Sequence, residues 1–226
     1  MASMLDETAA RSPHDGPLLI CGFQPFPAAP RNPAMEVIEA LREEDWSPAG
    51  RSAAYALIPT HWDEAAEAVL AAMATTQCAG VLLVGVAVRT RSFRVEMRAQ
   101  NRTSADRLDA SGEALGRDRI SVVGPAVIRA TAPVAAMLAA LRAEDLPATA
   151  SSDAGAYLCN YTLYRVLADG AGRPNPPPAG FLHVPQAREL AGDGAASTLP
   201  EIERAVRTAA EAFADALQTR RVLAVA

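Results

Sequence analysis

The stretch from Ala79 to Ala87 reads AGVLLVGVA, and it decides the fold class. It is a continuous aliphatic run with no polar face, and it is far shorter than the roughly 18 residues that a membrane-spanning helix needs. Runs of this kind are typical of strands buried on both faces, which occur in parallel sheets covered by helices on both sides. We therefore expect AGVLLVGVA to be a central strand of an α/β protein.

The segments on either side alternate between strand and helix patterns, which indicates βαβ units and a mainly parallel sheet. Further strands are predicted at 17–23, 52–59, 120–127, 147–155 and 181–185. Helices are predicted at 33–42, 61–74 and 131–146, from Tyr157 onward, and from Thr198 onward. The last of these opens with a capping box formed by Thr198 and Glu201, with Pro200 inside its first turn. Residues 88–116 break the pattern, and we expect a β-excursion there.

The length of 226 residues suits one large domain, which we place at 17–226 after a flexible N-terminal extension at 1–16. The extension has acidic residues and no apolar run, so it does not resemble a signal peptide. A formal net charge of −5 leaves no basic stripe for nucleic acid. No run is long and apolar enough for a membrane span.

The chain has three cysteines, Cys21, Cys78 and Cys159, and none forms a CxxC pair. Three cysteines cannot build a disulfide framework, and this spacing indicates no metal site. We therefore predict a reducing, cytoplasmic compartment. All basic residues are arginine, so no lysine is available as a nucleophile.

Three side chains with catalytic chemistry fall near strand ends, where sites form in open α/β sheets. Cys159 lies in the first turn of a predicted helix, whose unpaired N–H groups stabilise an anion and favour a reactive thiolate. His183 lies at the end of a short strand, and Glu96 follows the central strand. A nucleophilic cysteine needs a histidine to carry protons and a third group to orient that histidine.

Each of these residues also has a purely structural interpretation. Cys159 shares a helix face with Leu163 and Val166, as a core residue would. His183 alternates with apolar neighbours, and a strand histidine is commonly a structural residue whose ring nitrogens are hydrogen-bonded within the protein. Glu96 lies in an irregular, polar segment, where a glutamate is usually a surface carboxylate exposed to solvent. Taken one at a time, the three positions do not decide between the two interpretations.

Four stretches in order resemble the pyroglutamyl peptidase I (pyrrolidone-carboxylate peptidase) family of cysteine peptidases, over about Leu18 to Leu217. The first is CGFQPFPAAPRNPAMEVIEAL, which contains a GFxPF signature, and the second is GVAVRTRSFRVEMRAQN. The third is DAGAYLCNYTLY, which contains an AGxYxCN motif, and the fourth is AGFLHVP. The resemblance implies a three-layer α/β/α sandwich that removes N-terminal pyroglutamyl (5-oxoproline) residues from peptides through a thioester acyl-enzyme. It also implies an omega peptidase without metal or cofactor that assembles as a homotetramer or homodimer.

The resemblance assigns a role to each candidate. Cys159 is the nucleophile, His183 the general base and then acid, and Glu96 the residue that orients the imidazole. The substrate-binding residues that it implies are Phe23, Phe26, Asn32, Tyr157 and Leu158.

The chain departs from the family pattern around the expected pocket. Val88-Arg89-Thr90 replaces a Gly-Gly-Arg sequence, Pro27-Ala28 replaces two glycines, and Arg107 falls where an isoleucine is expected. These changes leave two alternatives open. One is a catalytically impaired relative that binds a small cyclic amide or a peptide terminus. The other is an amidohydrolase with a different small acyl preference. A nucleotide-binding role is not indicated, because GVAVRT lacks the required glycine spacing.

Overall fold

The computed structural model describes residues 15–225, with side chains described for 15–219. The predicted N-terminal extension, 1–16, lies outside the described residues except for its last two. In chain order the elements are β1 (Leu18–Phe23), α1 (Pro33–Glu43), β2 (Ala53–Ile58), α2 (Ala65–Thr76), β3 (Gly80–Val86), β4 (Phe93–Glu96), β5 (Arg98–Gln100), β6 (Val127–Arg129), α3 (Val134–Ala143), β7 (Ala148–Ser151), α4 (Leu158–Gly170), β8 (Ala179–Val184), α5 (Arg188–Ala191) and α6 (Leu199–Val225).

A six-stranded sheet with the order β2-β1-β3-β8-β4-β7 forms the middle of the molecule. The pairs β1–β2, β1–β3, β3–β8 and β4–β7 are parallel, and only β4–β8 is antiparallel within this sheet. The run AGVLLVGVA supplies β3, all of whose residues are buried, as its uninterrupted aliphatic pattern predicts. The prediction of a mainly parallel sheet is confirmed.

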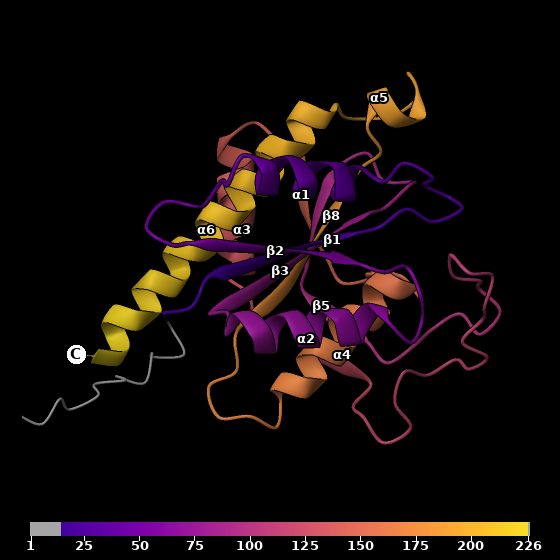
Figure 1. Cartoon of the computed structure of the whole chain (residues 1–226), viewed down its shortest axis with the longest axis horizontal. Coiled ribbons are helices and arrows are strands. Elements are labelled where there is room, and N and C mark those ends of the chain that lie inside the picture. Colours follow the sequence, from indigo (N-terminus) through magenta and orange to yellow (C-terminus); the bar gives the residue numbers. More distant parts are fainter. Residues whose placement is uncertain (1–14, 226) are drawn as a thin grey trace, which may run out of the picture.

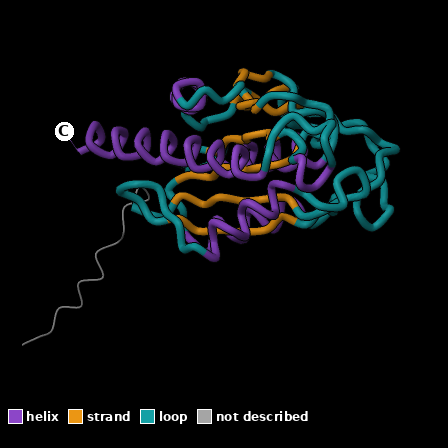
Figure 2. The backbone as a smooth tube through the Cα atoms, turned by 90° about the horizontal axis from the view of Figure 1, so that it is seen from above, coloured by secondary structure: helices purple, strands orange, loops and turns teal. Residues whose placement is uncertain are grey.

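Helices cover both faces of this sheet, which gives the predicted three-layer α/β/α sandwich. Helices α1, α3 and α6 lie on one face, and α2 and α4 lie on the other (Figure 1). Figure 2 shows that the largest group of loops gathers at the end of the molecule away from the C-terminal end of α6. Within residues 15–225, no helix is both long and apolar enough to cross a lipid bilayer.

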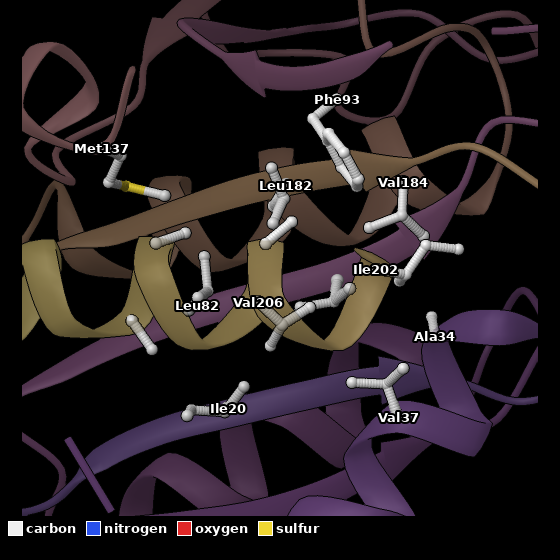
Figure 3. Close-up of a cluster of buried hydrophobic side chains, with 14 of the residues drawn as sticks. Ile20, Ala34, Val37, Leu82, Phe93, Met137, Leu182, Val184, Ile202 and Val206 are labelled. Atoms are coloured by element: carbon white, nitrogen blue, oxygen red, sulfur yellow. The ribbon is translucent and has the colours of Figure 1, made fainter. Parts of the chain in front are cut away.

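The core on the α6 side is built from aliphatic side chains of the sheet and the helices over it. Ile202 and Val206 of α6 point toward Leu82 of β3 and Leu182 of β8 (Figure 3). The helix starts where predicted, because Thr198 and Glu201 form the capping box. The Glu201 carboxylate accepts a hydrogen bond from the Thr198 backbone N–H at 2.8 Å, and the Thr198 hydroxyl accepts one from the Glu201 backbone N–H at 3.3 Å. The cap and the buried face together fix α6 against the sheet.

Residues 120–127 do not form the predicted strand. The side chain of Asn101 accepts hydrogen bonds from the backbone N–H groups of Ile120 and Ser121, and donates to the carbonyls of Ser121 and Gly124. These are the backbone groups that a strand ladder would use, so the segment is a loop. Its Val123 is 96% exposed, and the strand β6 begins only at Val127.

Two further differences from the prediction lie near the candidate site. Helix α2 begins at Ala65 and not at His61, because residues 61–64 form a turn in which the Asp109 carboxylate accepts a hydrogen bond from the Trp62 N–H. The β-excursion is divided: β5 pairs with β6 in a small separate sheet, while β4 belongs to the main sheet. Because β4 pairs with β8 in the main sheet, its residues lie at the candidate site.

Candidate active site

The antiparallel pairing of β4 with β8 brings Glu96 beside His183. Arg94 lies directly opposite His183 in the register, so Arg94 and Glu96 share the sheet face that carries the imidazole. The Nδ1 atom of His183 lies 2.8 Å from Oε1 of Glu96. Two residues that are 87 positions apart in the sequence are thus joined at the centre of the sheet.

Cys159 reaches the same point from the second position of α4. It is only partly buried, and it lies close enough to His183 to act on the pKa of the imidazole. Because Nδ1 of His183 contacts Glu96, Nε2 is the ring nitrogen left to interact with the sulfur. Sulfur, imidazole and carboxylate therefore lie in one row, with the imidazole in the middle. The predicted catalytic residues Cys159, His183 and Glu96 are brought together.

The protonation of His183 follows from its two neighbours. Burial alone would lower the pKa of His183, but Cys159 and then Glu96, through charge and hydrogen bonding, raise it to about 9. The ordinary value is 6.5. The imidazole, which lies between Cys159 and Glu96, thus holds its proton at neutral pH.

Glu96 is fully buried, in contrast to the solvent-exposed position that its purely structural interpretation predicts. Its Oε1 contacts His183 and also lies 3.7 Å from Nε of Arg94. The other oxygen, Oε2, has no hydrogen-bond partner among the described residues. A buried carboxylate needs opposite charges to remain ionised, and Arg94 and His183 are both placed to provide them.

Arg94 also fixes the segment that leads to the nucleophile. Its guanidinium donates hydrogen bonds to the hydroxyl of Ser151 and, at 2.8 Å, to the carbonyl of Asp153. Ser151 is the last residue of β7, and Asp153 lies in the loop that leads from β7 to α4 and Cys159. The sequence reasoning missed Arg94. The signal available for it was the period-two spacing from Glu96 within a strand.

The start of α4 is arranged to leave its first N–H groups available. The N-cap residue is Tyr157, which is extended and offers no side-chain hydrogen bond, and no acidic residue occupies the first turn. Asn160 ties this turn to the excursion through hydrogen bonds with the backbone of Gln100 and Arg102, each 2.8 to 2.9 Å long. Cys159 therefore lies at the positive end of a firmly anchored helix.

Room for the sulfur depends on a glycine in β3. A Cβ atom at Gly85 would lie 2.8 Å from the Phe181 ring and 3.2 Å from Sγ of Cys159. Such distances leave no space for a side chain. The Phe181 ring in turn packs on the imidazole of His183, with centroids 4.5 Å apart. A residue without a side chain at position 85 thus lets the helix and the two strands meet.

The row lies at the edge of a cavity of about 410 Å³. Cys159 and His183 line it, and so do all the predicted substrate-binding residues: Phe23, Phe26, Asn32, Tyr157 and Leu158. Glu96 lies behind the imidazole and does not line the cavity. Arg89, Arg94 and Arg107 also line it.

Aromatic side chains form one wall of the cavity. The rings of Phe26 and Tyr157 are 5.8 Å apart, and Trp62 packs edge-on against Tyr157 at 5.2 Å. Asn32 has a structural task as well, because its side chain caps α1 by accepting a hydrogen bond from the Ala34 N–H at 3.0 Å and donates to the Gln24 carbonyl. The cavity therefore has an apolar wall with a thiol at its edge, and this wall suits a small uncharged group.

The arrangement can perform covalent acyl transfer. It contains a nucleophile, a proton carrier and an orienting carboxylate in the order that such chemistry requires. Among residues 15–225, no cluster of three or more His, Cys, Asp or Glu side chains is placed to hold a metal ion.

Comparisons with known proteins point to the same chemistry. A family model described as pyroglutamyl peptidase matches residues 17–218. The pyrrolidone-carboxylate peptidase of Deinococcus radiodurans is 34% identical over 207 residues, covering 87% of this chain and 93% of that protein. The pyrrolidone-carboxylate peptidase of Mycobacterium tuberculosis is 32% identical over 171 residues, covering 74% of this chain and 76% of that protein.

Solved structures give the same result at the level of the fold. The pyroglutamyl peptidase I of Bacillus amyloliquefaciens superposes with a TM-score of 0.81 at 25% identity, covering 88% of this chain and 95% of that one. The pyrrolidone carboxyl peptidase of Thermococcus litoralis gives a TM-score of 0.82 at 25% identity, covering 91% of this chain and 96% of that one.

Proposed function

The chain belongs to the pyroglutamyl peptidase family, and on that premise we propose that Cys159, His183 and Glu96 release the N-terminal pyroglutamyl residue from peptides. The chain is a cysteine peptidase of this family. The observation that carries the residue assignment is the row of Cys159, His183 and Glu96, with Cys159 and His183 at the edge of the cavity.

In the first half of the reaction, the Cys159 thiolate attacks the carbonyl carbon of the pyroglutamyl group. A carbon–sulfur bond forms, and the electron pair of the carbonyl moves onto its oxygen. The uncapped N–H groups at the start of α4 are placed to stabilise that developing negative charge. When the intermediate collapses, the carbon–nitrogen bond breaks, and the His183 imidazolium gives its proton to the leaving amine. A thioester and a shortened peptide result.

In the second half, the now neutral His183 takes a proton from a water molecule, which attacks the thioester carbon. The carbon–sulfur bond breaks, free pyroglutamate leaves, and the proton on His183 restores the pair with the Cys159 thiolate. Glu96 holds the imidazole in one orientation and stabilises its charged form throughout. The net reaction consumes one water molecule for each amide bond broken.

The acyl group is a flat, uncharged five-membered lactam. We assign its place to the hollow beside Phe23, Phe26 and Tyr157, with Leu158 completing the wall. Apolar contact with the ring and a few backbone polar groups for its amide are sufficient to hold such a group. Asn32 lines the same hollow, although its side-chain amide is already hydrogen-bonded to the backbone of Gln24 and Ala34.

The test is the hydrolysis of pyroglutamyl-arylamide compared with prolyl-arylamide, which has the same ring without its carbonyl. We expect the prolyl compound to be poorer by roughly 100-fold or more in kcat/KM, because a charged ring amine replaces an uncharged amide in an apolar hollow. Equal rates would instead favour a different acyl preference. Binding of pyroglutamyl-amide without turnover would indicate a binding protein.

A further prediction concerns Arg94, whose side chain connects Glu96 to the segment before Cys159. Arg94→Met leaves the buried carboxylate without one of its two positive neighbours, so we expect kcat to fall by roughly tenfold or more. KM should change much less, and Arg94→Lys should recover part of kcat. The matched control is Arg91→Met, since Arg91 is exposed on the same segment and does not line the cavity. A loss shared by both variants would contradict the assignment.

We extend the proposal to assembly and location. A homodimer or homotetramer is supported by apolar side chains left on the surface, among them Val122 at 83% and Val123 at 96% exposure. Light scattering of the purified protein measures the number of copies, and a monomer at micromolar concentration would contradict it. A cytoplasmic location is supported by three cysteines that form no disulfide, and cell fractionation tests it.

A further inference from the structure

The cavity is positively charged although the chain as a whole is negative. Arg89, Arg94 and Arg107 line it, against a single acidic residue, Asp153. The formal net charge of the protein is −5. A lactam ring is uncharged and requires no arginine. Arg94 already has a part beside Glu96, so the chemistry proposed above leaves Arg89 and Arg107 unexplained.

The carboxylates near the cavity are already engaged. Asp153 accepts hydrogen bonds from Arg102 and from the Gly155 N–H, and these hold its pKa below the usual range even though partial burial would raise it. Glu96 is shared by His183 and Arg94. None of these side chains is left to neutralise Arg89 or Arg107.

Asp109, which is close to Arg107 in sequence, is directed inward. It accepts hydrogen bonds from the hydroxyl and N–H of Ser111 and from the N–H groups of Trp62 and Glu113. Within residues 15–219, no acidic side chain lies at ion-pairing distance from the guanidinium of Arg89 or Arg107. Both arginines are exposed.

Arg107 is nevertheless held in a defined position. Its guanidinium lies over the Tyr157 ring, 4.1 Å from the centroid, and its backbone carbonyl accepts a hydrogen bond from the indole of Trp62 at 3.1 Å. The Tyr157 hydroxyl donates to the next carbonyl, that of Leu108. Stacking occupies the face of the guanidinium and leaves its N–H edge free, which is the edge that binds carboxylates.

We propose that this cavity selects pyroglutamyl peptides that carry a carboxylate on the residue directly after the pyroglutamyl group. The inference rests on the proposed function. That residue is attached to the scissile nitrogen and so must lie close to Cys159, within the cavity that Arg89 and Arg107 line. The carboxylate has two possible sources, an acidic side chain or the free C-terminus of a dipeptide, and both present the same chemistry.

The probes are pyroglutamyl-glutamate amide, pyroglutamyl-glutamine amide and pyroglutamyl-lysine amide, together with pyroglutamyl-glutamine as the free acid. The first two differ only in one charge. We expect the glutamate amide to exceed the glutamine amide in kcat/KM by roughly five- to tenfold at low salt, with the lysine amide slowest. The free acid reports a terminal carboxylate. Added salt should reduce each ratio, because it screens exposed charges.

Variants identify the source of the preference. In Arg107→Gln and in Arg89→Gln we expect the ratio of glutamate to glutamine amide to fall, and to approach one in the double variant. Arg91→Gln is the control, since Arg91 is exposed nearby but does not line the cavity, and its ratio should stay at the wild-type value.

The outcomes separate the inference from its premise. Turnover of all substrates at equal rates, or a preference that survives the double variant, overturns the carboxylate preference and leaves the peptidase function standing. Failure to hydrolyse any pyroglutamyl amide, including the arylamide, overturns the proposed function and the preference with it. A preference confined to the free acid supports recognition of the terminal carboxylate.

Discussion

Cys159→Ala is expected to reduce kcat/KM for pyroglutamyl-arylamide by roughly 10⁴-fold or more, because the nucleophile acts as one unit with His183 and Glu96. The fold should persist, since the sulfur lies at the cavity edge and only fills space left by Gly85. Circular dichroism and thermal unfolding check this. A variant that retains more than a small fraction of the wild-type rate would remove Cys159 from the mechanism.

The other two cysteines provide the control. Burial raises the pKa of the Cys21 thiol, and it raises that of Cys78 to about 11. Neither residue lines the cavity. Brief treatment with iodoacetamide at neutral pH should therefore modify Cys159 selectively and abolish activity, as peptide mass mapping will show. Cys78→Ala should keep the wild-type rate and its inactivation by the reagent.

Glu96→Gln is expected to reduce kcat/KM by roughly 10² to 10⁴-fold and also to change the pH profile. The amide has the shape of the carboxylate but no charge. The pKa of His183, raised from 6.5 to about 9, owes part of that rise to the hydrogen bond and charge of Glu96. Without the charge, the imidazolium loses its proton at a lower pH.

The sign of the effect on the profile follows directly. In the wild type, His183 stays charged as the pH rises above 6.5 and becomes neutral only near pH 9. The alkaline limb of kcat/KM, which reports the coupled Cys159–His183 pair, should therefore move to lower pH in Glu96→Gln. Glu113→Gln is the control, because that side chain is exposed and does not line the cavity. An unchanged alkaline limb would show that Glu96 does not act on the imidazole.

Sequence patterns predicted the strands that have a strong local signal. The segments for β1, β2 and β3 are apolar runs, so the hydrophobic pattern of the sequence alone indicates them. The strand β4, FRVE, has only four residues, two of them charged, and its place between β8 and β7 depends on pairing with residues far along the chain. No local pattern contains that information.

The candidate site divides in the same way. Cys159, His183 and Glu96 could be proposed as candidates because their residue types have catalytic chemistry and because they lie in stretches that resemble family motifs. Arg94 had only the weak signal of its period-two spacing from Glu96, because an arginine in a short strand usually faces solvent. Its contacts with Glu96, Ser151 and Asp153 are created only by the folded chain. The same holds for the valines at 122 and 123, whose β propensity is overridden when Asn101 engages the neighbouring backbone.

The central position of β8 has a consequence for biosynthesis. This strand lies between β3 and β4, yet it comes from residues 179–184. A nascent chain that has not yet reached residue 179 has a gap in the middle of its sheet and lacks the imidazole. Because the proposed mechanism uses that imidazole, we expect no peptidase activity before β8 has been synthesised and inserted between β3 and β4.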